Sequence, residues 1–242
     1  FVLAHAETDG AGNAIAIHDH TAIVGVPNRG ASDEGGAYVY VRSGTSWTSE
    51  QVLVPSPEEG GDPGAAVAIW GDLAVVGAPG VDAGEGRAYA FARGGASWSQ
   101  VGAFGPSSGG VSSRTRYGTG VAAYEDTVAF GAPGDNFVHV HVRSGTEWSR
   151  EATLTGADSA SGDYFGRALS MRGDLLLVGA DGVDSNAGAA YVFARTGTEW
   201  AQQAKLTAPD VAATGRLGRA VSLHGTTAFV GALGDDDNGT GS

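Results

Sequence analysis

The chain has 242 residues, enough for one large β domain, and 42% of them are apolar, which allows a sizeable core. Only 17% are charged, too few for a disordered chain, and the 41 glycines follow no three-residue period, which excludes collagen. The formal net charge of -13 disfavours nucleic acid as a partner, because binding phosphates requires a basic surface.

The chain is organised as a tandem repeat. Residues 1–7 have the pattern of the last strand of a unit, and five units follow at residues 12–57, 63–105, 117–155, 163–208 and 215–242. An apolar stretch in each unit ends in a glycine, and these glycines, 52, 54, 48 and 52 residues apart, are Gly25, Gly77, Gly131, Gly179 and Gly231. A second marker keeps the same phase at intervals of 51, 50 and 52 residues, and consists of Trp47, Trp98, Trp148 and Trp200. Two markers in phase indicate a repeat of about 50 residues.

Each unit contains four strand-like stretches, which in the fourth unit are residues 167–171, 175–179, 190–195 and 199–206. A Gly-Asp turn joins the first two, as is typical of a tight hairpin. The third alternates with aromatic residues on one side, and no stretch has a helical period, so essentially no helix is expected. The sequence therefore predicts an all-β fold, a β-propeller of four-stranded antiparallel blades forming a single domain over residues 1–242.

The number of strands raises the question of closure. Four complete blades are flanked by one strand at the start and two at the end. We expect the five units to be a fragment of a six- or seven-bladed ring, because a ring missing one middle strand would leave backbone edges unpaired. The alternative is a five-bladed ring in which residues 1–6 supply the missing strand.

Two dipeptide motifs recur in the units. The fourth unit has Phe165-Gly166 and then Gly179-Ala180, and the third has Tyr117-Gly118 and then Gly131-Ala132-Pro133. These residues resemble the FG-GAP repeat, known from integrin α-subunit heads and bacterial surface proteins. The resemblance covers nearly the whole chain. It implies a propeller fold, a secreted or cell-surface location and a role in binding or adhesion.

The chain departs from the family in its acidic residues. The family's calcium loop lies between the two motifs, where every unit here has only a tight turn. Acidic runs occur one hairpin later and contain Asp82, Glu85, Asp184, Asp235, Asp236, Asp237 and Asn238. Their oxygens suit calcium, although Asp and Asn also favour solvated turns. The sequence leaves a calcium site open, with the run from Asp235 to Asn238 as its best candidate.

Other features have simpler structural explanations. Arg172-Gly173-Asp174 spells the tripeptide that integrins recognise, but it occupies a recurring hairpin turn. His139 and His141 share one face of a strand, as half a metal site would, but they replace the aromatic rings of the other units. No unit has a nucleophile, base and acid that its siblings lack, so we expect no enzyme activity.

Function is predicted to lie in the loops. Those joining the second and third strands share a face with the connections between blades, whereas Arg42, Arg93, Arg143 and Arg195 lie near the opposite face. The residues expected to bind a ligand are Asp82, Glu85, Asp184, Asp235, Asp236 and Asp237.

The first hypothesis is a non-catalytic extracellular binding or adhesion module that presents acidic loops to a protein or glycan. The alternatives are a lectin-like propeller with shallow sugar pockets between blades and an accessory domain of a larger surface enzyme. No apolar run reaches the roughly 18–20 residues that span a bilayer, so no membrane insertion is expected.

Overall fold

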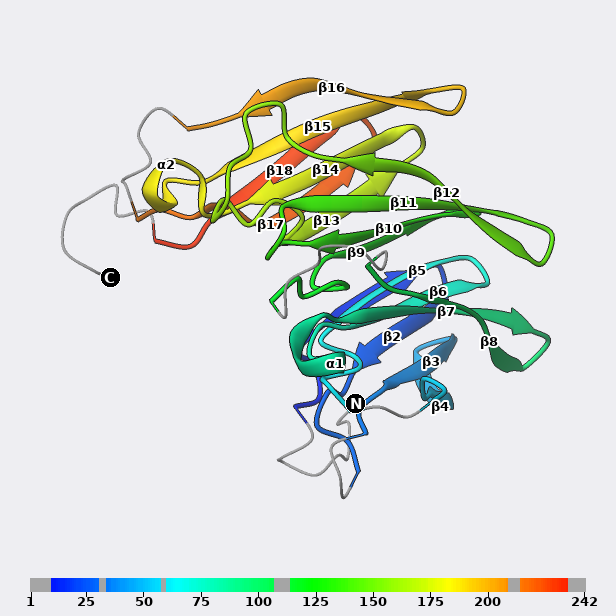
Figure 1. Ribbon diagram of the computed structural model, residues 1–242. Helices are drawn as coiled ribbons and strands as arrows, with labels where there is room; N and C mark the ends of the chain where they lie inside the picture. Colours follow the sequence, from blue (N-terminus) through cyan, green and yellow to red (C-terminus); the bar gives the residue numbers. More distant parts are fainter. Residues whose placement is uncertain (1–9, 31–33, 58–59, 107–113, 209–213, 235–242) are drawn as a thin grey trace.

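The computed structural model describes residues 10–30, 34–57, 60–106, 114–208 and 214–234, which form five antiparallel sheets (Figure 1). Four of the sheets have four strands in chain order and the fifth has two. The first blade contains β1 (Ile15–His18), β2 (Thr21–Gly25), β3 (Ala37–Ser43) and β4 (Ser46–Leu53). The second contains β5 (Ala66–Trp70), β6 (Leu73–Ala78), β7 (Arg87–Gly94) and β8 (Ser97–Phe104).

The remaining blades repeat this order. The third contains β9 (Val121–Tyr124), β10 (Thr127–Ala132), β11 (Phe137–Ser144) and β12 (Glu147–Leu154). The fourth contains β13 (Ala168–Arg172), β14 (Leu175–Ala180), β15 (Ala189–Thr196) and β16 (Glu199–Leu206). The described part of the fifth contains β17 (Leu217–His224) and β18 (Thr227–Ala232). The all-β fold of four-stranded propeller blades is thus confirmed.

Helix is confined, in the described residues, to α1 (Val81–Gly84) and α2 (Val183–Asn186). Each is a four-residue turn with two left-handed residues inside it. Within the described ranges, no helix is therefore long and apolar enough to cross a membrane.

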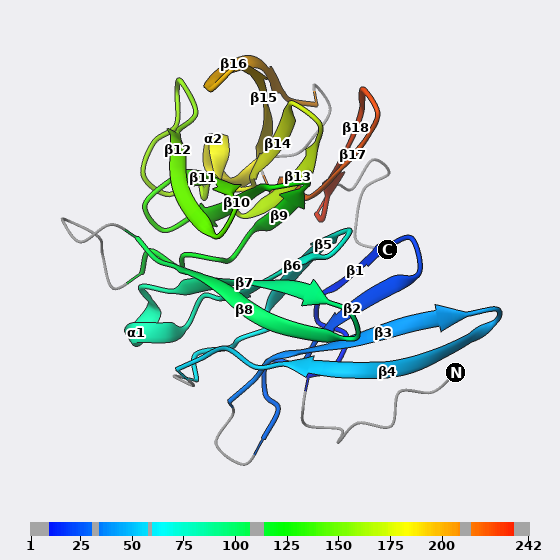
Figure 2. The same cartoon turned by 90° about the vertical axis from the view of Figure 1, so that its right-hand side faces the viewer.

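The blades pack face to face around the first strands. β1, β5, β9, β13 and β17 lie side by side in succession, and farther out β4 contacts β8 and β12 contacts β16 (Figure 2). The second strands β6 and β10 are buried at every residue because neighbouring blades cover both of their faces. The core is therefore a series of layers between blades.

Three of the recurring tryptophans, Trp98, Trp148 and Trp200, tie their blade to the one before it. The indole Nε1 of Trp98 donates a hydrogen bond of 2.9 Å to Glu50 of the first blade, and Arg93 forms an ion pair of 2.7 Å with the same carboxylate. Trp200 and Arg195 repeat this arrangement on Glu151 of the third blade. The tryptophans are therefore packing residues.

Close backbone contacts fix the spacing of the blades. A Cβ atom on Gly131, one residue before the end of β10, would overlap the carbonyl oxygen of Gly166 in the next blade. Gly25, Gly77 and Gly179 make the same approach to the blade that follows each of them. The shared glycine is therefore required by the approach of a neighbouring blade.

Apolar residues are exposed on the two outermost faces. Ile15 and Ile17 of β1 are 64% and 61% exposed, whereas their equivalents Val67 and Ile69 in β5 are 9% and 7% exposed. Phe229 of β18 is likewise 61% exposed. The two closure alternatives depend on residues 1–6, which lie outside the described residues, so both remain predictions.

We expect Gly131→Ala to lower the free energy of unfolding by about 3 kcal/mol, because a methyl group there must displace backbone of the next blade. Urea unfolding followed by tryptophan fluorescence measures the effect. Gly231→Ala is the matched control, since the nearest atom to a Cβ there is 3.7 Å away. Equal losses in the two variants would show that blade contact is not the reason for the glycine.

Candidate functional site

The loops that join second to third strands and the connections between blades lie at one end of the blades, which we call the loop face. Asp82 and Glu85 belong to the α1 loop of the second blade, and Asp184 holds the place of Asp82 in α2 of the fourth blade. Asp82 forms an ion pair of 2.9 Å with Arg87. Asp235, Asp236, Asp237 and Asn238 lie outside the described residues. The predicted binding role of these acidic residues stays a prediction.

The acidic runs have a clear local role as turns. Asp82 and Asp184 have φ values of 52° and 50°, a left-handed conformation that aspartate tolerates better than most residues. Backbone carbonyls of the two turns accept hydrogen bonds from the following blade, Gly84 from the N–H of Arg116 at 2.9 Å and Asn186 from that of Arg216 at 2.8 Å. Each turn thereby positions an arginine of the next blade.

Metal-binding geometry is missing from these turns. Among the described residues no three histidine or acidic side chains come together in a group that could hold a metal ion. The best calcium candidate from the sequence, Asp235 to Asn238, lies outside that part of the chain. Calcium binding at that run is still a prediction.

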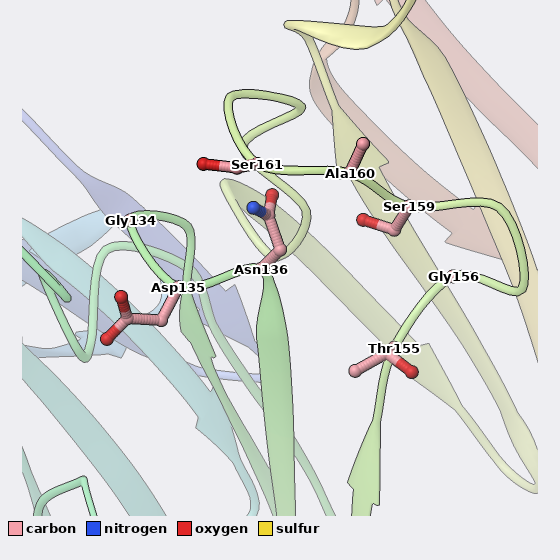
Figure 3. Close-up of a pocket in the computed structure, with 8 residues that line it drawn as sticks. All are labelled: Gly134, Asp135, Asn136, Thr155, Gly156, Ser159, Ala160 and Ser161. Carbon is pink, nitrogen blue, oxygen red and sulfur yellow. The ribbon is translucent and has the colours of Figure 1, made fainter. Parts of the chain in front are cut away.

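The third blade breaks the repeat on the loop face. Where its neighbours have α1 and α2, it has only the short hairpin Gly134, Asp135 and Asn136. A cavity of about 410 Å³ adjoins this hairpin and is lined also by Thr155, Gly156, Ser159, Ala160 and Ser161 (Figure 3).

The polar groups of this cavity are only partly paired. Thr115 donates a hydrogen bond to the Asp135 carboxylate, which points away from Ser159 and Thr155 in Figure 3. Asn136 accepts a hydrogen bond of 3.0 Å from the N–H of Phe165. The buried hydroxyl of Ser159 has no hydrogen-bond partner within the described part of the chain.

A second cavity, of about 720 Å³, shares Gly134 and Ser161 with the first. The two together are called the loop-face pocket below. Its second part lies between α1, the connection before β9 and the connection before β13, and the side chains that line it include Arg114, Arg116, Thr119, Tyr164 and Arg167. The pocket therefore exists where the third blade lacks the turn that its neighbours have.

The electrostatics of the pocket centre on Asp181. This residue is 3% exposed and takes the place of the proline in the third unit's Gly-Ala-Pro. Its carboxylate lies 3.2 Å from Arg219 and 3.5 Å from Arg167. Burial lowers the pKa of Arg167, Asp181 opposes this, and the charges of Arg219, Arg116 and Arg216 lower it further.

Sequence reasoning missed these arginines. It compared loops by their acidic runs and expected basic residues on the opposite face. There Arg93, Arg143 and Arg195 are in ion pairs with Glu50, Asp126 and Glu151, and Arg42 contacts His20 and Trp47. The available signal was an arginine next to the Phe-Gly-like motif in three units, together with aspartate in place of the proline at position 181.

The Arg172-Gly173-Asp174 tripeptide is a hairpin turn between β13 and β14. The Arg172 guanidinium lies over the Trp70 ring, 5.0 Å from its centroid, and also over the ring of Tyr124. Because its arginine is engaged in cation–π contacts, the tripeptide is part of the packing at this end of the blades.

His139 and His141 lie in a groove between the second and third blades. They contact the rings of Tyr117 and Phe104 respectively, as replacements for packing rings should. The groove has a volume of about 370 Å³, and its other side chains are Ala103, Phe104, Trp148 and Arg150. Nδ1 of His139 and Nε2 of His141 are buried without a hydrogen-bond partner.

The stacked four-stranded blades with a pocket at their loop end define a β-propeller repeat protein. A family model described as FG-GAP repeat matches residues 47–91, 148–193 and 200–242, more than half of the chain. The chain therefore belongs to the FG-GAP repeat family, as the sequence predicted. Each of the first two matches starts at the tryptophan of one blade's fourth strand and ends in the third strand of the next blade.

A similar solved structure is the crystal structure of a protein from Lactobacillus plantarum, a structural-genomics target. It has a TM-score of 0.57 and 14% sequence identity over 81% of this chain. The chain spans 55% of the length of that protein, and the likeness concerns the fold alone. A comparison with curated proteins gave no match.

We expect acid to destabilise the protein through its two groove histidines. Burial lowers the pKa of each to about 4 in the folded chain, and the charge of Arg150 adds to the effect. The unfolded chain, with histidine near 6.5, binds protons that the folded chain does not. Stability should therefore fall as the pH drops from about 6.5 to about 4.

Urea unfolding at about pH 7 and about pH 4.5 measures this loss, which we expect to be on the order of a few kcal/mol for the two rings together. The variant His139→Tyr with His141→Phe restores the ring types that the second and fourth blades have at these positions, so it should lose clearly less stability between the two pH values. Equal losses in the variant and the native chain would assign the acid sensitivity to carboxylates.

Proposed function

We propose that the protein is a non-catalytic extracellular binding module whose ligand docks on the loop face. The observation that carries the proposal is the loop-face pocket, which lies where the third blade departs from its neighbours. A repeated scaffold with one altered loop is an economical way to form one site, because the other blades hold its walls rigid. Its two cavities, of about 410 and 720 Å³, are of the size that small ligands occupy.

Membership of the FG-GAP repeat family supports the extracellular location, since such repeats are typical of extracellular proteins. The acidic loops fit the same proposal. The α1 turn contributes Ala83 and Gly84 to the pocket wall and carries Asp82 and Glu85 beside it. A protein or glycan on this face would meet carboxylates around the pocket and arginines inside it.

A binding role is favoured over catalysis by the chemistry of the pocket. Its polar side chains are hydroxyls, arginines and two residues already hydrogen-bonded within the chain, Asp135 and Asn136. The described lining residues include no histidine and no pair of carboxylates that could act as acid and base.

A labelling experiment tests the proposed face. The chain has no cysteine, so one introduced cysteine gives one site for a bulky maleimide. We expect labelled Ser161→Cys to lose binding to an array of extracellular-matrix proteins and glycans, because Ser161 is exposed and lines both cavities.

The matched control is labelled Thr45→Cys, in the exposed turn between β3 and β4 at the opposite end of the first blade. It should bind like the native chain. Array binding that survives the Ser161 label would contradict the loop face as the binding surface.

A second candidate function is sugar binding in the groove between the second and third blades. It is favoured by the cavity of about 370 Å³ there, where the rings of Trp148 and Phe104 offer apolar surface to a sugar. Labelled Ala103→Cys, at an exposed position in this groove, separates the two candidates. If glycan binding is lost with this label and kept with the Ser161 label, the groove is the site.

A further inference from the structure

The loop-face pocket has a local excess of positive charge in an acidic protein. Arg116, Arg167, Arg216 and Arg219 are close enough to influence one another, since the other three lower the pKa of Arg167. Among the described residues, Asp181 is the one carboxylate in an ion pair with any of these four. Even with the Asp135 carboxylate of the adjoining cavity counted beside Asp181, the four arginines leave an excess of positive charge that favours a further anion, although the whole chain carries -13.

The backbone at two of the arginines is unusual. Arg116 and Arg216 have φ values of 55° and 53°, and the equivalent position in the second unit is Asp62, also left-handed. Arginine is a costly choice for that conformation, whereas glycine, asparagine or aspartate would be easier. A residue held at such a cost indicates that its side chain has a role of its own.

The remaining walls suit a small polar ligand. Tyr164 is 41% exposed and lines the pocket with its ring under the Arg167 guanidinium, 5.7 Å from the ring centroid to the guanidinium carbon. The hydroxyl of Ser161 is exposed on the same wall. A cationic group, an aromatic ring and a hydroxyl line one pocket.

We propose that the loop-face pocket binds an oxyanion, a carboxylate, sulfate or phosphate carried by a small ligand, through the guanidinium groups of Arg116 and Arg167. Tyr164 packs against the body of the ligand. Arg216 and Arg219 strengthen the local positive potential, and Asp181 holds Arg167 and Arg219 in place. The inference rests on the proposed function only in taking the loop face as the binding surface.

The charge distribution also limits the size of the anion. A long polyanion extending beyond the pocket would meet Asp82, Glu85 and the negative field of the whole chain. A ligand with one or two charges gains from the arginines without that repulsion. The pocket therefore favours a small acid over a nucleic acid or a heavily sulfated polymer.

Isothermal titration calorimetry of the whole chain with glucuronate tests the inference, with glucose as the neutral probe of the same shape. We expect glucuronate to bind with a Kd of about 1 mM or lower and glucose to give no heat in that range. Titrations with inorganic sulfate and phosphate show which oxyanion the site prefers. Binding of any of the three supports the proposal.

The decisive variant is Arg116→Gly, which relieves the left-handed backbone and removes one guanidinium. It should melt at the native temperature or above and bind the anion at least tenfold more weakly. Arg42→Gln is the matched control, because it removes the same charge from an exposed residue of β3. It should bind like the native chain.

The proposal is overturned if glucuronate, sulfate and phosphate all fail to bind, or if Arg116→Gly and Arg42→Gln weaken binding equally. Failure here is separable from failure of the proposed function. Array binding that is blocked by the Ser161 label while none of the three anions binds would leave the loop face as the binding surface and refute only the oxyanion.

Discussion

The structure depends on one backbone contact. The shared glycine near the end of the second strand approaches the carbonyl of the glycine that opens the next blade, as seen at Gly25, Gly77, Gly131 and Gly179. The opening glycine also donates its backbone N–H to the carbonyl of the second-strand glycine in its own blade. In the third blade this hydrogen bond joins Gly118 to Gly131 at 2.9 Å. Because Gly131 leaves no room for a side chain against Gly166, adjacent blades are held at backbone distance near the first strands. The tryptophan and glutamate contacts between outer strands can then form at a fixed separation.

This contact also determines what the loop face can do. The residue two positions before the opening glycine is left-handed in every described unit, at Gly10, Asp62, Arg116, Tyr164 and Arg216. In the third and fifth blades this residue is Arg116 and Arg216. Each donates its backbone N–H to a carbonyl in the helical turn of the preceding blade, α1 or α2. The fourth blade has Tyr164 there, beside the short hairpin, and the pocket opens at this point. One altered loop in a rigid repeat is thus sufficient to form a pocket.

Much of the fold could be predicted from the sequence, because phased glycines and tryptophans mark contacts that recur in every blade. The site could not be predicted in the same way. Arg116 and Arg167 precede different blades and meet only when those blades stack, so no local motif contains both. Counting acidic residues pointed to Asp82 and Asp184, whose left-handed φ values also suit a turn, and their binding role stays a prediction. The sequence shows that Asp181 stands where the third unit has the proline of Gly-Ala-Pro. Its burial beside two arginines could not be predicted, because one arginine comes from the fourth blade and the other from the fifth.

The distribution of charges explains how an acidic chain keeps a cationic pocket. Away from the loop face, ion pairs hold Arg93, Arg143 and Arg195 on carboxylates of the strands and hairpins, so these arginines contribute little net field. At the pocket a single buried carboxylate is shared by Arg167 and Arg219, and the backbone of α1 and α2, not an acidic side chain, holds Arg116 and Arg216. Within the described ranges, neither of these two guanidinium groups is in an ion pair, so their charge adds to the local positive field. The turns that carry Asp82 and Asp184 therefore position Arg116 and Arg216 through backbone hydrogen bonds, without forming ion pairs with their guanidinium groups.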